Sequence, residues 1–175
     1  MKRSHARTPP APLGARVIPI QGRPHRIEVR VAPVRRSRLV RLNGTVWLLL
    51  AQKERRPTAE LLAAWLRNEA RRIIEARVAQ LAALHGFRYR SVFIRAQRTR
   101  WGSCSSLGNL SFNYRLVLVP PEVLDYVILH ELTHLEVPNH SPRFWATLAR
   151  LCPDYLARLR WLRRQERTLM EWLPF

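Results

Sequence analysis

The chain has little cysteine and no long apolar run. Its 175 residues contain two cysteines, Cys104 and Cys152, which are too few for a disulfide framework in a domain of this size. Reduced thiols in the cytoplasm are therefore expected. The apolar runs, such as 46–51 and 123–129, the second of which Asp125 interrupts, are far shorter than the roughly 20 residues that a membrane span requires. These shortages exclude a disulfide-stabilised secreted domain and a membrane-spanning protein.

Acidic residues and lysine are also scarce. Twelve Asp and Glu stand against 31 Lys and Arg, which gives a formal net charge of +19. Lys2 and Lys53 are the only lysines, so 31 less 2 leaves 29 arginines. Such a charge attracts phosphate polymers, and a non-specific nucleic-acid contact is one explanation of it. A compositional bias toward arginine is the other, because the charge is spread through the chain.

Apolar and aromatic residues are plentiful. They include six tryptophans within a hydrophobic share of 47%, which excludes disorder through most of the chain and indicates one globular domain. We assign this domain to residues 25–175. Residues 1–24 are basic and hold five prolines, so we predict a flexible tail there. The prolines also interrupt the apolar core that a signal peptide needs, so no export is expected.

Hydrophobic periodicity predicts strands, a long helix, strands again and finally helices. Asn43-Gly44 lies between two strand-like runs and is a strong hairpin signal. Thr58 is the expected N-cap of the long helix, and Gly86 suits its C-terminal end. The predicted strands span about 27–31, 38–42, 45–50, 91–96 and 109–114, and later helices begin near residues 121, 142 and 154. This order indicates an α+β fold with a small antiparallel or mixed sheet on the long helix.

The segment HELTHLEVPNH, residues 130–140, concentrates the chemistry-bearing residues. His130 and His134 are about 400° apart on a helix, so their rings leave one face a single turn apart. Zinc favours imidazole nitrogen, and a catalytic zinc keeps three protein ligands and one open position. At this chain's own composition, an HExxH pentad is expected by accident about 0.01 times. We therefore predict a zinc site on this helix.

The third ligand must come from outside that helical turn. His140 is the natural candidate, because Pro138 ends the helix and lets the chain turn back toward the metal. Glu136 and Asp154 are weaker candidates. Glu131 is expected to act as the general base that takes a proton from the attacking water, and not as a ligand.

Further motifs surround this segment: RWGSC, Asn109-Leu110-Ser111, Pro120-Pro121 and HELxHLxxxNHSxxFW. Together they closely resemble the YgjP-like metallopeptidase family, relatives of the SprT-like zincins, densely over about residues 92–151. The resemblance implies a zincin-like fold, with a small sheet, a long helix behind it and an active-site helix. It also implies zinc on His130, His134 and His140, with Glu131 as the catalytic residue. The proline-rich first two dozen residues lie outside the resemblance.

The bond that such an enzyme cleaves stays open, because peptidase and nucleotide phosphohydrolase activities are both attached to the family. For a peptide substrate, we predict that 109–114 is an edge strand that pairs with it, with Asn113 and Arg115 at the rim. For a nucleoside triphosphate, arginines such as Arg100 would clamp the phosphates. Asn113, Arg115 and Tyr126 are also candidates for stabilising an oxyanion.

Three functions are therefore carried forward. The leading one is a cytoplasmic zinc-dependent metallopeptidase. The second keeps the zinc but makes the substrate a nucleoside triphosphate. The third is a nucleic-acid-binding module with a structural zinc, which predicts salt-sensitive binding and no hydrolysis of any substrate.

Overall fold

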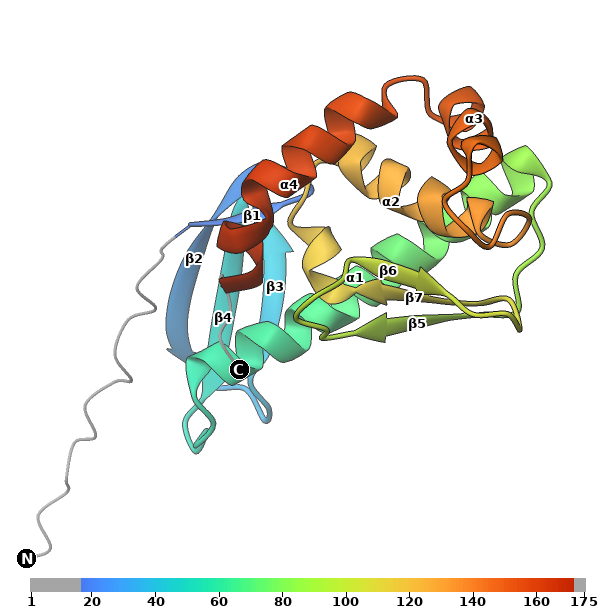
Figure 1. The fold of residues 1–175 in the computed structure, drawn as a ribbon. Coiled ribbons are helices and arrows are strands. Elements are labelled where there is room, and N and C mark those ends of the chain that lie inside the picture. The colour runs from blue at the N-terminus through green and yellow to red at the C-terminus, as the bar shows by residue number, and fades with distance from the viewer. Residues whose placement is uncertain (1–16, 172–175) are drawn as a thin grey trace, which may run out of the picture.

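The N-terminal part of the protein forms a twisted mixed sheet. In the computed structural model, which describes residues 17–171, this sheet has the strand order β1-β2-β4-β3. The strands are β1 (Val17–Ile20), β2 (Arg23–Ala32), β3 (Arg38–Leu42) and β4 (Thr45–Ala51). The predicted β3–β4 hairpin is confirmed, while β2 pairs with β4 in parallel. Its position within the molecule is seen in Figure 1.

The prediction of a flexible tail over residues 1–24 is wrong for residues 17–24. This segment forms β1 and the start of β2, and Pro19 lies opposite Pro24 in their antiparallel pair. Proline is tolerated here because β1 is an edge strand and Pro24 precedes the first residue of β2 that pairs with β4. The turn between the strands is anchored by the Gln21 amide, which donates to the Val117 carbonyl at 2.7 Å. Residues 1–16 of the predicted tail lie outside the described residues.

Helix α1 (Thr58–His85) runs past both sheets of the molecule. Its N-cap is Pro57, not the predicted Thr58, which is buried and is the first residue of the helix. Gly86 ends the helix in the left-handed conformation at φ 77°, as expected. Near its N-terminus Leu61 packs against the buried β4 residues Leu48 and Leu50. One face of the N-terminal sheet is thus covered by this helix.

The second sheet has the order β5-β7-β6 and carries the site described below. Its strands are β5 (Ser91–Arg95), β6 (Gly102–Cys104) and β7 (Asn109–Asn113). The predicted edge strand over 109–114 is wrong in its position, because β7 lies between β5, its parallel partner, and β6, its antiparallel partner. The short strand β6, which was not predicted, occupies an edge instead. A 3₁₀ helix, η1 (Tyr114–Val117), follows β7.

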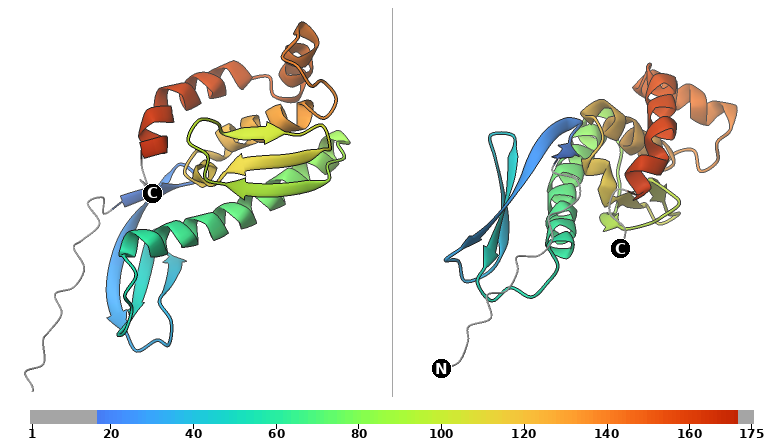
Figure 2. Two further views of the ribbon diagram at one scale, coloured as in Figure 1. Left: turned by 60° about the horizontal axis from the view of Figure 1, so that its bottom comes forward. Right: turned by 90° about the vertical axis from the view of Figure 1, so that its left-hand side faces the viewer.

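The C-terminal part is helical, with α2 (Pro121–Thr133), α3 (Pro142–Leu151) and α4 (Tyr155–Glu171). Helix α2 ends at Thr133, earlier than the predicted Glu136, but His134 keeps right-handed helical dihedrals as its C-cap. Figure 2 shows α1 between the N-terminal sheet and the remaining elements. The α+β prediction, with mixed sheets packed on a long helix, is confirmed. Among residues 17–171, no helix is both long and apolar enough to cross a membrane.

Candidate metal centre

Three histidine side chains converge at the C-terminal end of α2. One ligand nitrogen from each of His130, His134 and His140 lies within 4.8 Å of the other two. The Nε2 atoms of His130 and His140 are 2.9 Å apart. The ring centroids of His134 and His140 are separated by 4.6 Å, and each lies 5.0 Å from that of His130. The structure therefore brings together the three imidazoles that the spacing predicted.

The turn after α2 carries His140 back to the helix that holds the other two. His134 Nδ1 lies 3.1 Å from the Val137 carbonyl oxygen, which fixes the plane of this ring. His140 is exposed, yet Trp145 of α3 stacks on its ring at 5.5 Å and donates from Nε1 to its carbonyl oxygen at 3.1 Å. These contacts reduce the conformational freedom that His140 would lose on binding a metal.

Phe144 forms the apolar floor of the cluster. Its fully buried ring lies 4.8, 4.5 and 4.7 Å from the rings of His130, His134 and His140 respectively. An apolar floor keeps water away from one side of the imidazoles and lowers the local dielectric constant, which strengthens electrostatic interactions within the site.

The protonation states of His130 and His134 suit a metal. Burial lowers the pKa of His130 to about 3, helped by the positive charges that His134 and His140 would carry. Burial also lowers the pKa of His134. Metal ligation requires neutral imidazole, and a hydrogen bond from His134 Nδ1–H to Val137 leaves its Nε2 lone pair available. Three imidazoles without a carboxylate among them form a ligand set that zinc favours.

The weaker candidates for a third ligand do not join the cluster. In the described part of the chain, the metal-compatible group at this place consists of the three histidines. Glu136 is exposed on the turn after α2, and the carboxylate of Asp154 lies 3.8 Å from Arg158. The structure thus favours His140 over both acidic residues.

Glu131 lies beside the histidines with its side chain buried under strand β6. Its exposed fraction is 6%, and burial raises its pKa to about 8, while the positive charge of Arg100 lowers it. A Cβ atom added to Gly102 would lie 2.5 Å from Glu131 Oε1. The edge strand can therefore approach the carboxylate so closely only because residue 102 is glycine.

Two cavities adjoin the site, one toward each end of β6. The cavity at the Gly102 end has a volume of about 230 Å³ and includes His130 and Glu131 in its lining. Its other lining residues are Trp101, Tyr126, Val127, Leu159, Leu162, Arg163 and Glu166. The cavity at the Cys104 end, of about 410 Å³, is lined by His134 and by the polar residues Arg88, Ser105 and Ser106, among others. Strand β6 thus has a cavity toward each of its ends.

The predicted substrate-binding residues separate into two groups. Arg100 is exposed and near enough to Glu131 for its charge to act on that carboxylate. Asn113 and Arg115, by contrast, are both buried, so neither offers its side chain at the surface, where contact with a substrate was predicted. Arg115 instead lies over the ring of Tyr114 at 4.8 Å. The polar character of Asn113 and Arg115 in the sequence did not reveal that they are buried.

Tyr126 remains at the site as a candidate hydrogen-bond donor. It lines the cavity beside Glu131, and its ring centroid lies 6.0 Å from that of His130. Burial raises its pKa to about 12, opposed by the charge of Arg163. The phenol therefore keeps its proton at neutral pH and is able to donate it in a hydrogen bond.

Two residues with a clear place in the site were not predicted from the sequence. These residues are Gly102, which lies against Glu131, and Trp145, which stacks on His140. The RWGSC motif contained the signal for Gly102, since a glycine within a strand often marks a close approach. The contact of Trp145 with His140 carried no such local signal, because it depends on how α3 returns beneath α2.

Replacing Asn113 by Ala is expected to lower the free energy of unfolding by about 1–3 kcal/mol, the usual cost of leaving buried polar groups unsatisfied. Asn113 Nδ2 donates to the carbonyls of Gln97 at 2.7 Å and Arg100 at 3.2 Å, and its Oδ1 accepts from the Arg115 amide at 3.1 Å. Urea unfolding would measure the change, with Asn109→Ala in the same strand as the control. A raised KM with unchanged stability would contradict this structural role.

An α+β chain in which three imidazoles converge beside a buried carboxylate falls into the class of metallohydrolases. More closely, the chain belongs to the YgjP-like family, since the model of the YgjP-like metallopeptidase domain matches residues 1–165. The match includes the proline-rich N-terminal residues, so the expectation that they lie outside the resemblance is wrong. The small sheet, the long helix and the helix that carries His130 and Glu131, which the resemblance implied, are all present.

Comparisons with individual proteins add little beyond the family. The metallopeptidase zymogen abylysin of Pyrococcus abyssi is similar at a TM-score of 0.47 and 20% identity, over 52% of this chain and 93% of that one. The metallopeptidase zymogen jannalysin of Methanocaldococcus jannaschii gives 0.41 and 24%, over 49% and 92%. None of the curated proteins compared with the chain matches it.

Proposed function

We propose that this metallopeptidase domain is a zinc-dependent peptidase in which His130, His134 and His140 hold the metal and Glu131 is the general base. The observation that carries the proposal is the burial of the Glu131 carboxylate beside the three imidazoles and beneath a sheet edge. Zinc, when bound, would polarise the scissile carbonyl and the attacking water as a Lewis acid.

Glu131 supplies the proton transfer in this proposal. A general base works best when its pKa lies near the working pH, and burial raises the pKa of Glu131 to about 8. Its carboxylate takes a proton from the attacking water and then gives it to the leaving amine. The charge of Arg100 favours the ionised form before the reaction, and the Tyr126 phenol is placed to donate toward the developing oxyanion.

Strand β6 is the feature that favours a peptide over a nucleotide. As an edge strand it has main-chain groups on one side that no other strand pairs with among the described residues. An extended peptide can pair with such an edge, and this edge lies directly over Glu131. The cavity of about 230 Å³ at its Gly102 end includes Trp101, Val127, Leu159 and Leu162, which suits an apolar side chain of the substrate.

The nucleotide alternative is supported by the other cavity. Arg88, Ser105 and Ser106 line the cavity at the Cys104 end, and arginine with hydroxyl groups is suited to phosphate oxygens. The charge of Arg100 adds to this on the side of Glu131. We rank the nucleotide alternative second, because the free main-chain edge of β6 can pair with a peptide but has no specific interaction with a triphosphate.

A substrate panel tests the proposal. Zinc-loaded protein is given quenched fluorescent peptides with apolar, acidic or basic residues around the scissile bond, and in parallel the nucleoside triphosphates with detection of released phosphate and pyrophosphate. Peptide cleavage that prefers apolar residues and is lost in Glu131→Gln supports a peptidase. Release of phosphate or pyrophosphate that is lost in Glu131→Gln would instead support the nucleotide alternative and contradict the peptidase. Hydrolysis of neither class would leave the nucleic-acid-binding module with a structural zinc.

Replacing His140 by Ala is expected to lower the zinc affinity at least tenfold while the fold persists. His140 is exposed and lies between two helices, so its ring contributes little to the core, whereas a tetrahedral site loses one of its three protein ligands. Elemental analysis after dialysis would show about one zinc per chain in the wild type and much less in the variant. Asn139→Ala, one residue earlier on the same exposed turn, is the control. Equal zinc content in the His140 variant would argue for a different third ligand.

The cytoplasmic location stays a prediction. Cys104 and Cys152 are both unpaired in the part of the chain that the structure describes. Burial raises the pKa of both thiols, which keeps them protonated and unreactive. Unpaired, unreactive thiols suit a reducing compartment.

A further inference from the structure

The N-terminal sheet leaves one face without a covering helix. Residues that pair across neighbouring strands point to the same face, so Glu28, Trp47 and Val40 share this face at the centre of the sheet. We call it the outer face, since α1 covers the opposite one, as the right-hand view of Figure 2 shows. By the same register the outer face also contains Arg26, Arg30, Arg38, Leu42, Thr45 and Leu49. None of these residues belongs to the metal centre.

The outer face is strongly basic, and its arginines are not neutralised. Arg26, Arg30 and Arg38 are exposed, and within the described residues none of them has an ion pair with an acidic side chain. Glu28 is the acidic residue among them. On the helix side of the sheet, by contrast, Arg41 lies 3.9 Å from Glu69.

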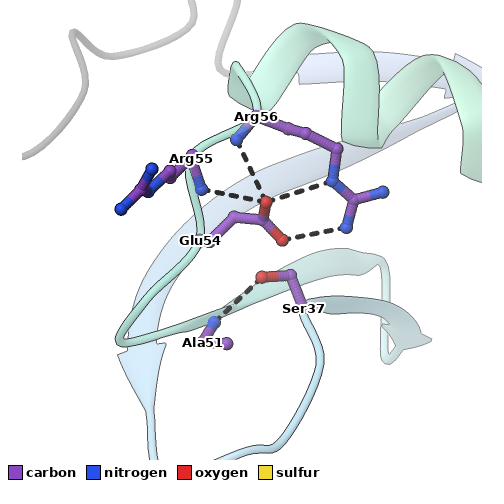
Figure 3. A network of polar contacts seen from close by, with 5 residues as sticks. All are labelled: Ser37, Ala51, Glu54, Arg55 and Arg56. Carbon is purple, nitrogen blue, oxygen red and sulfur yellow. Dashed lines mark hydrogen bonds and ion pairs between the residues drawn. The ribbon is translucent and has the colours of Figure 1, made fainter.

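The loop between β2 and β3 extends this charge. Arg35 and Arg36 are exposed and, with Arg38, line a hollow of about 570 Å³. Ser37 fixes the loop by accepting a hydrogen bond from the Ala51 amide at 2.9 Å. As Figure 3 shows, the nearby Glu54 carboxylate is already engaged by Arg56, with its two guanidinium contacts at 3.0 and 2.9 Å, and by two backbone amides. The charge of Glu54 is therefore compensated by Arg56, and it does not neutralise the arginines of the β2–β3 loop.

Trp47 gives the outer face an aromatic centre. Its half-buried ring lies beneath the guanidinium of Arg30, whose central carbon is 4.3 Å from the ring centroid. Val40 and Leu42 beside it are 39% and 58% exposed. Indole and guanidinium planes are the groups on which unpaired bases stack, with surrounding arginines on the phosphates.

We propose that the outer face of the N-terminal sheet binds single-stranded nucleic acid, with Trp47 and Arg30 as the stacking platform and Arg26, Arg38 and the β2–β3 loop on the backbone. The ten residues of β2 extend about 33 Å, enough for several nucleotides. A second copy of the chain is disfavoured as the occupant, because a symmetric contact would place like charges together. The proposal is independent of the peptidase function.

Fluorescence anisotropy with labelled 20-nucleotide oligo-dT and oligo-U tests this inference on the zinc-loaded full chain. Trp47→Leu keeps an apolar side chain on the sheet and is expected to weaken binding at least about fivefold, the lower end of the effect of losing one base stack. Arg30→Gln combined with Arg38→Gln is expected to flatten the plot of log affinity against log salt by about 1.4, from two phosphate contacts at about 0.7 each.

The matched control is Arg150→Gln combined with Arg164→Gln, two exposed arginines of α3 and α4. It removes the same charge elsewhere and should change the salt slope little. Circular dichroism and thermal melts establish that each variant folds. If the control and outer-face variants lose the same affinity, if polyglutamate binds as well as the oligonucleotides, or if the wild type binds neither oligonucleotide near 100 mM salt, the proposal fails. Concentration-dependent dimerisation that Trp47→Leu abolishes would also overturn it, in favour of a self-association surface.

Discussion

Glu131→Gln is expected to retain the metal and to lower kcat by about 10²- to 10⁴-fold, the range attributed to general acid–base catalysis. Glutamine has nearly the same volume, so it fills the same space beneath β6, but its amide does not accept a proton at neutral pH. The three imidazoles remain in place because none of the contacts that position them involves the Glu131 side chain. A variant that keeps zinc and loses turnover would assign Glu131 to proton transfer.

The same variant is also expected to differ from the wild type in how its stability depends on pH. Glu131 is buried and its pKa is raised, which means that its ionised form is less favourable in the folded metal-free chain than in the unfolded chain. Since the folded-state pKa lies above the unfolded one, the metal-free wild type loses stability as pH rises from about 5 to about 8. Glu131→Gln should remove this part of the loss, as chemical denaturation of the metal-free proteins at several pH values would show.

The controls separate chemistry from charge. Glu136→Gln removes the same charge from an exposed position on the following turn and should leave kcat within about twofold, since a single exposed charge has little effect. Zinc content and KM are measured for both variants. A Glu131 variant with near wild-type kcat would contradict its role as the base, whereas one that lost its zinc would point to a ligand.

The clustering of the three histidines was predictable because its geometry is local. The spacing of His130 and His134 fixes their common face through the helical repeat alone, and this holds even though α2 ends one residue before His134. Pro138 and the cap position of Ser141 likewise limit where His140 can go. A few neighbouring residues are sufficient to determine such short-range constraints.

The predictions that were wrong depend on contacts between segments that are distant in the sequence. Residues 17–24 were assigned to a flexible tail because of their prolines. The stretch Val17–Ile20 instead pairs with β2 as strand β1, and its residues Ile18 and Ile20 are buried. Strand β6 has three residues, too few for a periodic signal, and its position at the edge depends on β7. Asn113 was assigned to the substrate since a polar side chain in a sequence does not reveal whether its partners are water, substrate or buried carbonyls.

Gly102→Ala is expected to lower kcat by about 10- to 100-fold while zinc stays bound, although the change adds one methyl group. The added Cβ would lie 2.5, 2.7 and 2.8 Å from Oε1, Cγ and Cδ of Glu131, distances that force either the carboxylate or β6 to move. A displacement of about 1 Å at a reacting group can cost about 10² in rate. Overpacking of this kind also costs about 1–3 kcal/mol of stability.

Ser103→Ala is the matched control, because it alters the next residue of the same strand, whose side chain points to the opposite face, and keeps the main-chain edge intact. A fall in kcat for Gly102→Ala alone, with equal zinc content, would mean that glycine is required so that the sheet edge can lie against the catalytic carboxylate. Equal losses in both variants would place the effect in the strand as a whole. Full activity in Gly102→Ala would contradict the close contact of β6 with Glu131, and with it the proposal that the peptide pairs with this edge.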